Sequence, residues 1–229
     1  FMLPLGPELA ESTLRVLAHF QATEEDLHTG AEPGKILHEL RAEPVLMKGE
    51  FKNNVRLPPL YYGTIDATEL WIILLGESIK WGMPDSHVAA LLNNLELALR
   101  WMRDCGDADG DNLLEYMDRT GHGLSNQGWK DSSDSIRWRD GSLAQGPIAL
   151  CEVQGYAYQA AVAGANILDH FDRSGTAELR EWAESLRDRF NDRFWVEDDR
   201  GRYPAVALDR DKRPVDSVTS NIGHLLGTG

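Results

Sequence analysis

Residues 64–81 read Thr64-Ile-Asp-Ala-Thr-Glu-Leu-Trp-Ile-Ile-Leu-Leu-Gly-Glu-Ser-Ile-Lys-Trp81. A helix over this stretch would carry apolar side chains on nearly every side. Such a helix is buried among its neighbours on all sides. Thr64 is suited to cap its first turn. The segment therefore predicts an inner helix of a helical protein.

The flanking segments predict helices of a second kind. Residues 8–21 and 87–104 place apolar residues on one face and charges on the other, which is typical of a helix with one face in water. The pattern then repeats further along the chain. Residues 147–168 are mostly small and apolar, with Pro147 suited to the first helical turn, and residues 176–193 are amphipathic.

This alternation predicts an all-α fold in which helical hairpins form a ring of two layers. Residues 215–226 are expected to begin the next inner helix, and residues 22–60 read as irregular. A small β-hairpin insertion is predicted over 194–208, around the turn Asp198-Asp-Arg-Gly201. Residues 1–229 are expected to form a single domain. An ordinary helical bundle is the alternative that periodicity alone leaves open.

Composition narrows the classes of partner. The chain has 229 residues and a formal net charge of -14 at pH 7, whereas binding to nucleic acid or an anionic membrane needs a basic surface. No apolar run is long enough to cross a bilayer, and no signal peptide is visible. Cys105 and Cys151 are too few for a disulfide framework and read as small buried hydrophobes. We expect a cytoplasmic protein with neither membrane nor nucleic acid as a partner.

The segment Asn126-Gln-Gly-Trp-Lys-Asp-Ser-Ser-Asp-Ser-Ile-Arg-Trp138 carries the residue types of a carbohydrate site. A carboxyl such as that of Asp131 or Asp134 can protonate a glycosidic oxygen. The indole of Trp129 can stack on a sugar ring, and Lys130 and the amides can hold hydroxyls. A helix cap or loop role for Asp131, and core packing for Trp129, are the structural alternatives.

Six segments in order strengthen this interpretation: Pro33-Gly-Lys-Ile-Leu-His-Glu-Leu-Arg41, Tyr61-Tyr-Gly-Thr-Ile-Asp-Ala-Thr68, Gly106-Asp-Ala-Asp-Gly-Asp111, Asn126-Gln-Gly-Trp-Lys-Asp131, Cys151-Glu-Val-Gln-Gly-Tyr156 and Ser217-Val-Thr-Ser-Asn-Ile-Gly-His224. With them the chain resembles bacterial amylo-α-1,6-glucosidases, the glycogen-debranching-type six-hairpin glycosidases, from about residue 31 onward. The resemblance implies an (α/α)6 toroid that hydrolyses α-glucosidic bonds with inversion and needs no cofactor.

The resemblance also implies that the chain holds the N-terminal part of such a toroid, because six hairpins need several hundred residues. Phe1-Met2 and Gly227-Thr-Gly229 at the two ends lead to the same expectation of a piece of a longer chain. The expected partners are an oligo- or polysaccharide and the remainder of the catalytic domain. The general base is expected in that remainder, so this piece alone is expected to be inactive.

The resemblance assigns the general acid to Asp131, because related debranching enzymes have Trp-x-Asp there. Trehalases have Gly-Trp-Asp, which leaves Asp134 as a competitor. The other expected sugar contacts are Asp66, Trp129, Lys130, Asp134, Glu152 and Gln154. Asp66 could instead complement a helix dipole, and Glu152 could form a structural ion pair with an arginine. His38 and Arg41 are weak candidates for the edge of the pocket, and His224 could equally be a packed helix residue.

A second constellation resembles a calcium loop. Oxygens fall at the required spacing on Asp107, Asp109, Asp111, the carbonyl of Leu113, Glu115 and Asp118. Asn112 stands where such loops have glycine, and asparagine tolerates the left-handed backbone that this position needs. Two interpretations stay open, a structural Ca²⁺ site and an acidic surface turn. Two rival functions also stay open, a trehalase-like six-hairpin glycosidase and a non-catalytic carbohydrate- or calcium-binding helical module.

Overall fold

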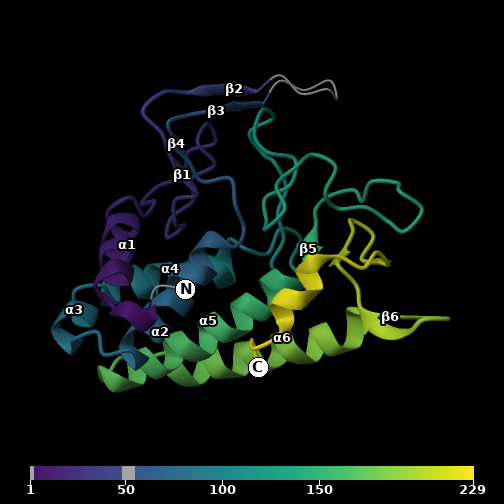
Figure 1. Cartoon of the computed structure of the whole chain (residues 1–229). Helices are drawn as coiled ribbons and strands as arrows, with labels where there is room; N and C mark the ends of the chain where they lie inside the picture. Colours follow the sequence, from purple (N-terminus) through teal and green to yellow (C-terminus); the bar gives the residue numbers. More distant parts are fainter. Residues whose placement is uncertain (1–2, 48–54) are drawn as a thin grey trace.

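The computed structural model describes residues 3–47 and 55–229 and is mostly helical (Figure 1). Its main helices are α1 (Glu8–His19), α2 (Ala67–Lys80), α4 (Leu92–Asp104), α5 (Cys151–His170) and α6 (Thr176–Arg193). Shorter helical segments are η1 (Leu3–Leu5), α3 (Asp85–Ala89) and η2 (Ser220–Leu225). None of the helices in these two ranges is both long and apolar enough to cross a membrane.

Helices α2 and α5 form the inner layer and pack side by side. They approach closely at Gly76, where an added Cβ would lie 3.1 Å from the Cβ of Ala163. Helices α1 and α4 pack against α2, and α6 lies along α5. The indole Nε1 of Trp71 in α2 donates to the carbonyl of Leu14 in α1 at 3.1 Å. The expected inner and outer helices are thus present, but α2 is not buried on every side as predicted, because Leu70 is 41% exposed. A closed ring of six hairpins goes beyond what the described residues form.

Small antiparallel sheets correct the all-α expectation. They pair β1 (Glu39–Leu40) with β4 (Leu60–Tyr61), β2 (Val45–Met47) with β3 (Val55–Leu57), β5 (Ala149–Leu150) with β8 (Ala207–Leu208), β8 with β9 (Pro214–Val215), and β6 (Trp195–Asp198) with β7 (Gly201–Pro204). The predicted hairpin is confirmed as β6–β7. The strands β1 to β3 and the first residue of β4 lie in the range 22–60 expected to be irregular, of which 48–54 fall outside the described residues.

Three helix predictions need correction. The range 87–104 contains two helices, α3 and α4, which are separated at Ala90 and Leu91. The range 147–168 opens with strand β5 because the backbone of residues 148–150 pairs with Tyr116 and β8, so α5 begins at Cys151 and Pro147 lies outside it. In the range 215–226 the only helical part is η2, a 3₁₀-helix.

Candidate functional site

The inner helices begin at the same end of the fold with one carboxyl each. Asp66 immediately precedes α2, and Glu152 lies in the first turn of α5. Burial raises the pKa of both carboxyls, and the charge of Asp66 contributes to the rise at Glu152. The two carboxyls are therefore within electrostatic reach of each other, as expected if both line one site.

Asp66 is fixed by the loop that carries the Trp-Lys-Asp segment. Thr64 Oγ1 donates to Asp66 Oδ1 at 2.5 Å and lies 3.2 Å from the carbonyl oxygen of Gln127. The amide of Ile65 donates to the same carbonyl at 2.8 Å. Thr64 thus orients the Asp66 carboxylate and does not cap the helix as predicted.

Glu152 is fully buried and holds η2 in place. Asn221 Nδ2 donates to Glu152 Oε1 at 2.6 Å, and Thr219 Oγ1 donates to Asn221 Oδ1 at 2.7 Å. Asn221 is itself 0% exposed. The partner of Glu152 is therefore the amide of Asn221 and not an arginine.

An aromatic cluster lies within electrostatic reach of these carboxyls. The Trp129 side chain is 57% exposed, and its ring centroid lies 4.8 Å from that of His224 in η2. The hydroxyl of Tyr156 hydrogen-bonds His224 Nδ1. Burial raises the pKa of Tyr156, and the charges of Glu152 and Asp66 add to the rise. A half-exposed indole beside fixed polar groups is a surface on which a sugar ring can stack.

Asp131 lies on the open side of the same cluster. Burial lowers the pKa of His38, and the charges of Asp66 and Asp131 oppose that fall, so the three side chains are within electrostatic reach of one another. Asp131 is exposed and the neighbouring Lys130 is partly exposed. Arg41 is engaged by Glu39.

Asp134 faces a different space. Its Oδ2 pairs with Arg137 Nη2 at 2.7 Å. It lines a cleft of about 520 Å³ together with Asn126, Tyr116 and Ile148, whereas Asp66, Trp129 and Glu152 do not. A cleft of that size is in the range of small-molecule sites, so Asp134 remains a structural competitor of Asp131.

Gln154 has a structural role. Its Nε2 donates to the carbonyls of Leu114 at 2.8 Å and Leu150 at 3.1 Å, and its Oε1 accepts from the amide of Leu114 at 3.0 Å. The side chain is 1% exposed. These bonds tie α5 to the loop that follows α4, so the predicted sugar contact finds no support in this geometry.

The acidic loop after α4 gathers around a lysine. Lys212 Nζ lies 2.8 Å from Asp109 Oδ2 and 3.2 Å from Asp111 Oδ2, and it also contacts Glu115 Oε1. Burial raises the pKa of Glu115 to about 7, and the contact with Lys212 opposes the rise. Asp107 contributes a further oxygen to the cluster.

Asp118 and Leu113 are also predicted to contribute oxygen ligands to this loop. The carboxylate of Asp118 accepts from Thr120 and Gly123, so it turns to its own loop and away from the cluster. The predicted ligand atom of Leu113 is its backbone carbonyl, and neither its core side chain nor the 3.0 Å bond from its amide to Asp111 Oδ1 tests that prediction. Asn112 has a φ of 63°, which confirms the left-handed turn expected there.

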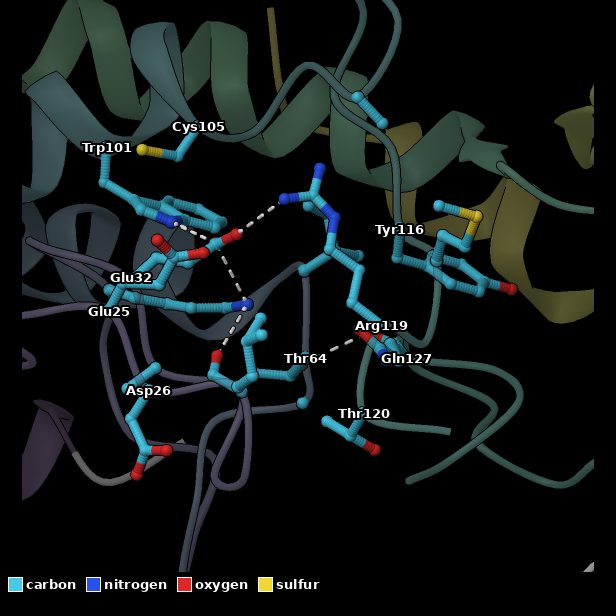
Figure 2. Close-up of a pocket in the computed structure, with 18 of the residues that line it drawn as sticks. Glu25, Asp26, Glu32, Thr64, Trp101, Cys105, Tyr116, Arg119, Thr120 and Gln127 are labelled. Carbon is cyan, nitrogen blue, oxygen red and sulfur yellow. Dashed lines mark hydrogen bonds and ion pairs between the residues drawn. The ribbon is translucent and has the colours of Figure 1, made fainter. Parts of the chain in front are cut away.

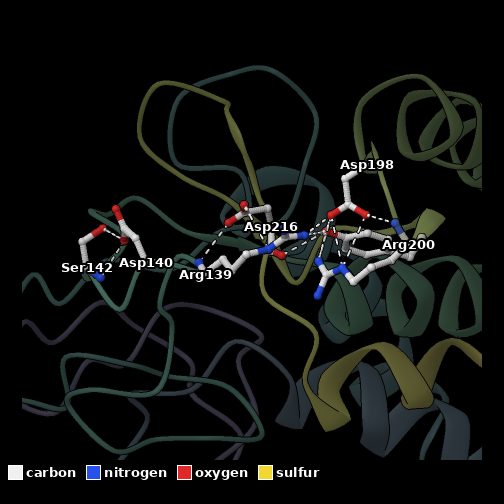
Figure 3. Close-up of polar contacts among 7 residues, drawn as sticks. Arg139, Asp140, Ser142, Asp198, Arg200 and Asp216 are labelled. Carbon is white, nitrogen blue, oxygen red and sulfur yellow. Dashed lines mark hydrogen bonds and ion pairs between the residues drawn. The ribbon is translucent and has the colours of Figure 1, made fainter.

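Two further features are a small cavity next to Thr64 and a network of ion pairs and hydrogen bonds around Arg139. Figure 2 shows a pocket bordered by Glu32, Trp101, Thr64 and Gln127. Its cavity volume is about 50 Å³, which is too small for a sugar ring. Figure 3 shows a network in which Arg139 contacts Asp198 of the β6–β7 hairpin and its backbone amide donates to Asp216 Oδ1 at 2.9 Å. This network connects the loop after Trp138 to the segment that leads into η2.

No family model matches the chain, and no curated protein matches it.

Sequence reasoning missed two residues of the site. Tyr156 follows Glu152 by four positions and so shares its face of α5, a signal that the sequence already contained. Asn221 carried no such signal, because its pairing with Glu152 spans 69 positions. His224, left open between packing and function, lies against Trp129.

Proposed function

We propose that this chain supplies the proton-donor half of an inverting α-glucosidase site that cleaves α-1,6 branch-type linkages. The observation that supports the proposal best is the convergence of four segments at one end of α2 and α5. These segments contribute Asp66, Trp129, Glu152 and His224. Carbohydrate sites need such a combination of an aromatic face and oriented carboxyls.

In this proposal Asp131 protonates the glycosidic oxygen, and Trp129 stacks on the glucosyl ring. Asp66 and Lys130 bind hydroxyls, and Glu152 positions η2 through Asn221. The base that activates water would stand about 6.5–9.5 Å from the acid and belongs, on the family resemblance, to the remainder of the catalytic domain. No metal or cofactor is needed for this chemistry.

The acid assignment is tested with Asp131→Asn and Asp134→Asn in the chain joined to that remainder. Glucose release from panose is expected to fall about 10²–10⁴-fold in the first variant, the usual contribution of a general acid. The second variant is expected to stay within about tenfold of the wild type, because Asp134 is engaged by Arg137. The released glucose should be the β-anomer by NMR.

The opposite ranking would assign the acid to Asp134. Faster cleavage of trehalose than of panose would favour a trehalase-like enzyme. Saturable binding of glucosides without any hydrolysis would leave the binding-module alternative and refute the catalytic proposal.

A further inference from the structure

The cluster of Asp107, Asp109, Asp111 and Glu115 is one that the glucosidase chemistry does not use. Asp107, Asp109 and Glu115 each place a ligand oxygen within 4.8 Å of the others. Such a grouping on an acidic protein surface is common, so the cluster needs further evidence before it indicates a cation site.

That evidence comes first from Glu115. Its side chain is 0% exposed, and its Oε2 is buried with no hydrogen-bond partner among the described residues. A buried, unpartnered carboxylate oxygen is costly, and a hard cation is the ligand that would satisfy it.

Lys212 gives a second, independent indication. It comes from the turn between β8 and β9, far from the loop in sequence, and its ammonium contacts Asp109, Asp111 and Glu115 at once. The position where these three carboxylates meet is therefore already a position for a positive charge.

The local charge is not balanced by this lysine. Four carboxylates face two cationic side chains, Lys212 and Arg193, the latter through a 2.9 Å contact with Asp111. Glu115, whose pKa is raised to about 7, is only partly ionised at pH 7, so three aspartates minus two cations leave a formal excess of at least one negative charge. Asp107 is already oriented, since it accepts from the amides of Gly110 and Asn112 at 2.7 Å each, and the oriented loop is of the kind that holds Ca²⁺ through protein oxygens.

We propose that the 107–115 loop is a Ca²⁺ site and that the Lys212 ammonium is its intramolecular competitor. The ion would take the position between Asp107, Asp109 and Glu115, and Lys212 would leave it. Mg²⁺ fits less well, because it prefers to keep its water and needs a strict octahedron.

Calorimetric titration of the chain with CaCl₂ tests the proposal. We expect a single site in the wild type, binding at least about tenfold weaker in Asp109→Asn, and binding at least about tenfold tighter in Lys212→Met, where the competing charge is gone. Asp109 is exposed, so its substitution should leave folding intact, which the melting temperature verifies.

Two control variants separate site from surface charge. Arg213→Met removes the same charge one position away, where the side chain pairs with Asp209. Asp118→Asn removes the carboxylate that sequence spacing alone would include. Both should bind Ca²⁺ like the wild type. The proposal is overturned if wild type shows no saturable heat up to about 10 mM CaCl₂, if Asp109→Asn binds normally, or if Lys212→Met and Arg213→Met change affinity equally.

Discussion

At the scale of single residues, buried carboxyls dominate the chemistry of this protein. Glu69 in α2 is 0% exposed, and both of its carboxylate oxygens lack a hydrogen-bond partner among residues 3–47 and 55–229. Burial raises its pKa well above the ordinary value, with Asp66 adding to the rise and Lys35 opposing it. The folded protein therefore retains a proton that the unfolded chain releases as pH increases.

This difference predicts a pH-dependent stability gain in Glu69→Gln. Above the unfolded pKa of about 4.3, the wild type loses folding stability with rising pH until the raised pKa is reached, whereas the amide does not titrate. The stability of the variant relative to wild type should therefore grow by about 1.4 kcal/mol per pH unit through this window. Urea unfolding at pH 5, 6 and 7 measures it.

Glu77→Gln, on a more exposed position of the same helix, is the matched control and should keep the pH slope of the wild type. A constant difference between Glu69→Gln and wild type across the three pH values would contradict the prediction.

At the scale of elements, the contact between α2 and α5 depends on small side chains. An added Cβ at Gly76 would lie 3.1 Å from the Cβ of Ala163. Gly76→Val is expected to separate the helices and lower the free energy of unfolding by about 1–3 kcal/mol. Chemical denaturation measures the change.

Ala163→Gly tests whether crowding against Ala163 causes this loss of stability, because it removes the facing methyl group on α5. Combined with Gly76→Val, it should lower stability by less than the sum of the two single changes. Strict additivity would show that the two positions do not interact.

The elements also show what periodicity can predict. The apolar residues around Trp71 predict burial of this helix on all sides. The structure buries Trp71, Ile72 and Leu75 of α2 but leaves Leu70 41% exposed, so the prediction holds for only part of its surface. The helix predicted over Ile148-Ala149-Leu150 is wrong, because a short apolar run suits a strand equally well and these residues pair with Tyr116 and β8. Neither Ala90 nor Leu91 is a helix-breaking residue. The division between α3 and α4 therefore depends on packing, which the periodicity of the sequence does not show.

The sequence predicts some residues of the candidate site but not the hydrogen-bond partners of others. Asp66 and Glu152 stand out as carboxyls in apolar segments, and the structure brings them within electrostatic reach of each other. The roles of Gln154 and Asn221 depend on partners 40 and 69 positions away, and a single sequence does not encode such pairings in any local pattern.

At the scale of the whole molecule, the site combines the starts of α2 and α5 with the loop that carries Trp129 and with η2. The proposed function requires that this site binds a glucosyl unit. Calorimetric titration with 1-deoxynojirimycin, a glucose-configured iminosugar, tests this most directly. The account predicts saturable binding to the wild-type chain and affinity at least about tenfold lower, or ~1.4 kcal/mol, in Trp129→Ala and Asp66→Asn. The galactose-configured epimer should bind more weakly. Absence of saturable binding, or equal affinity in the wild type and both variants, would contradict it.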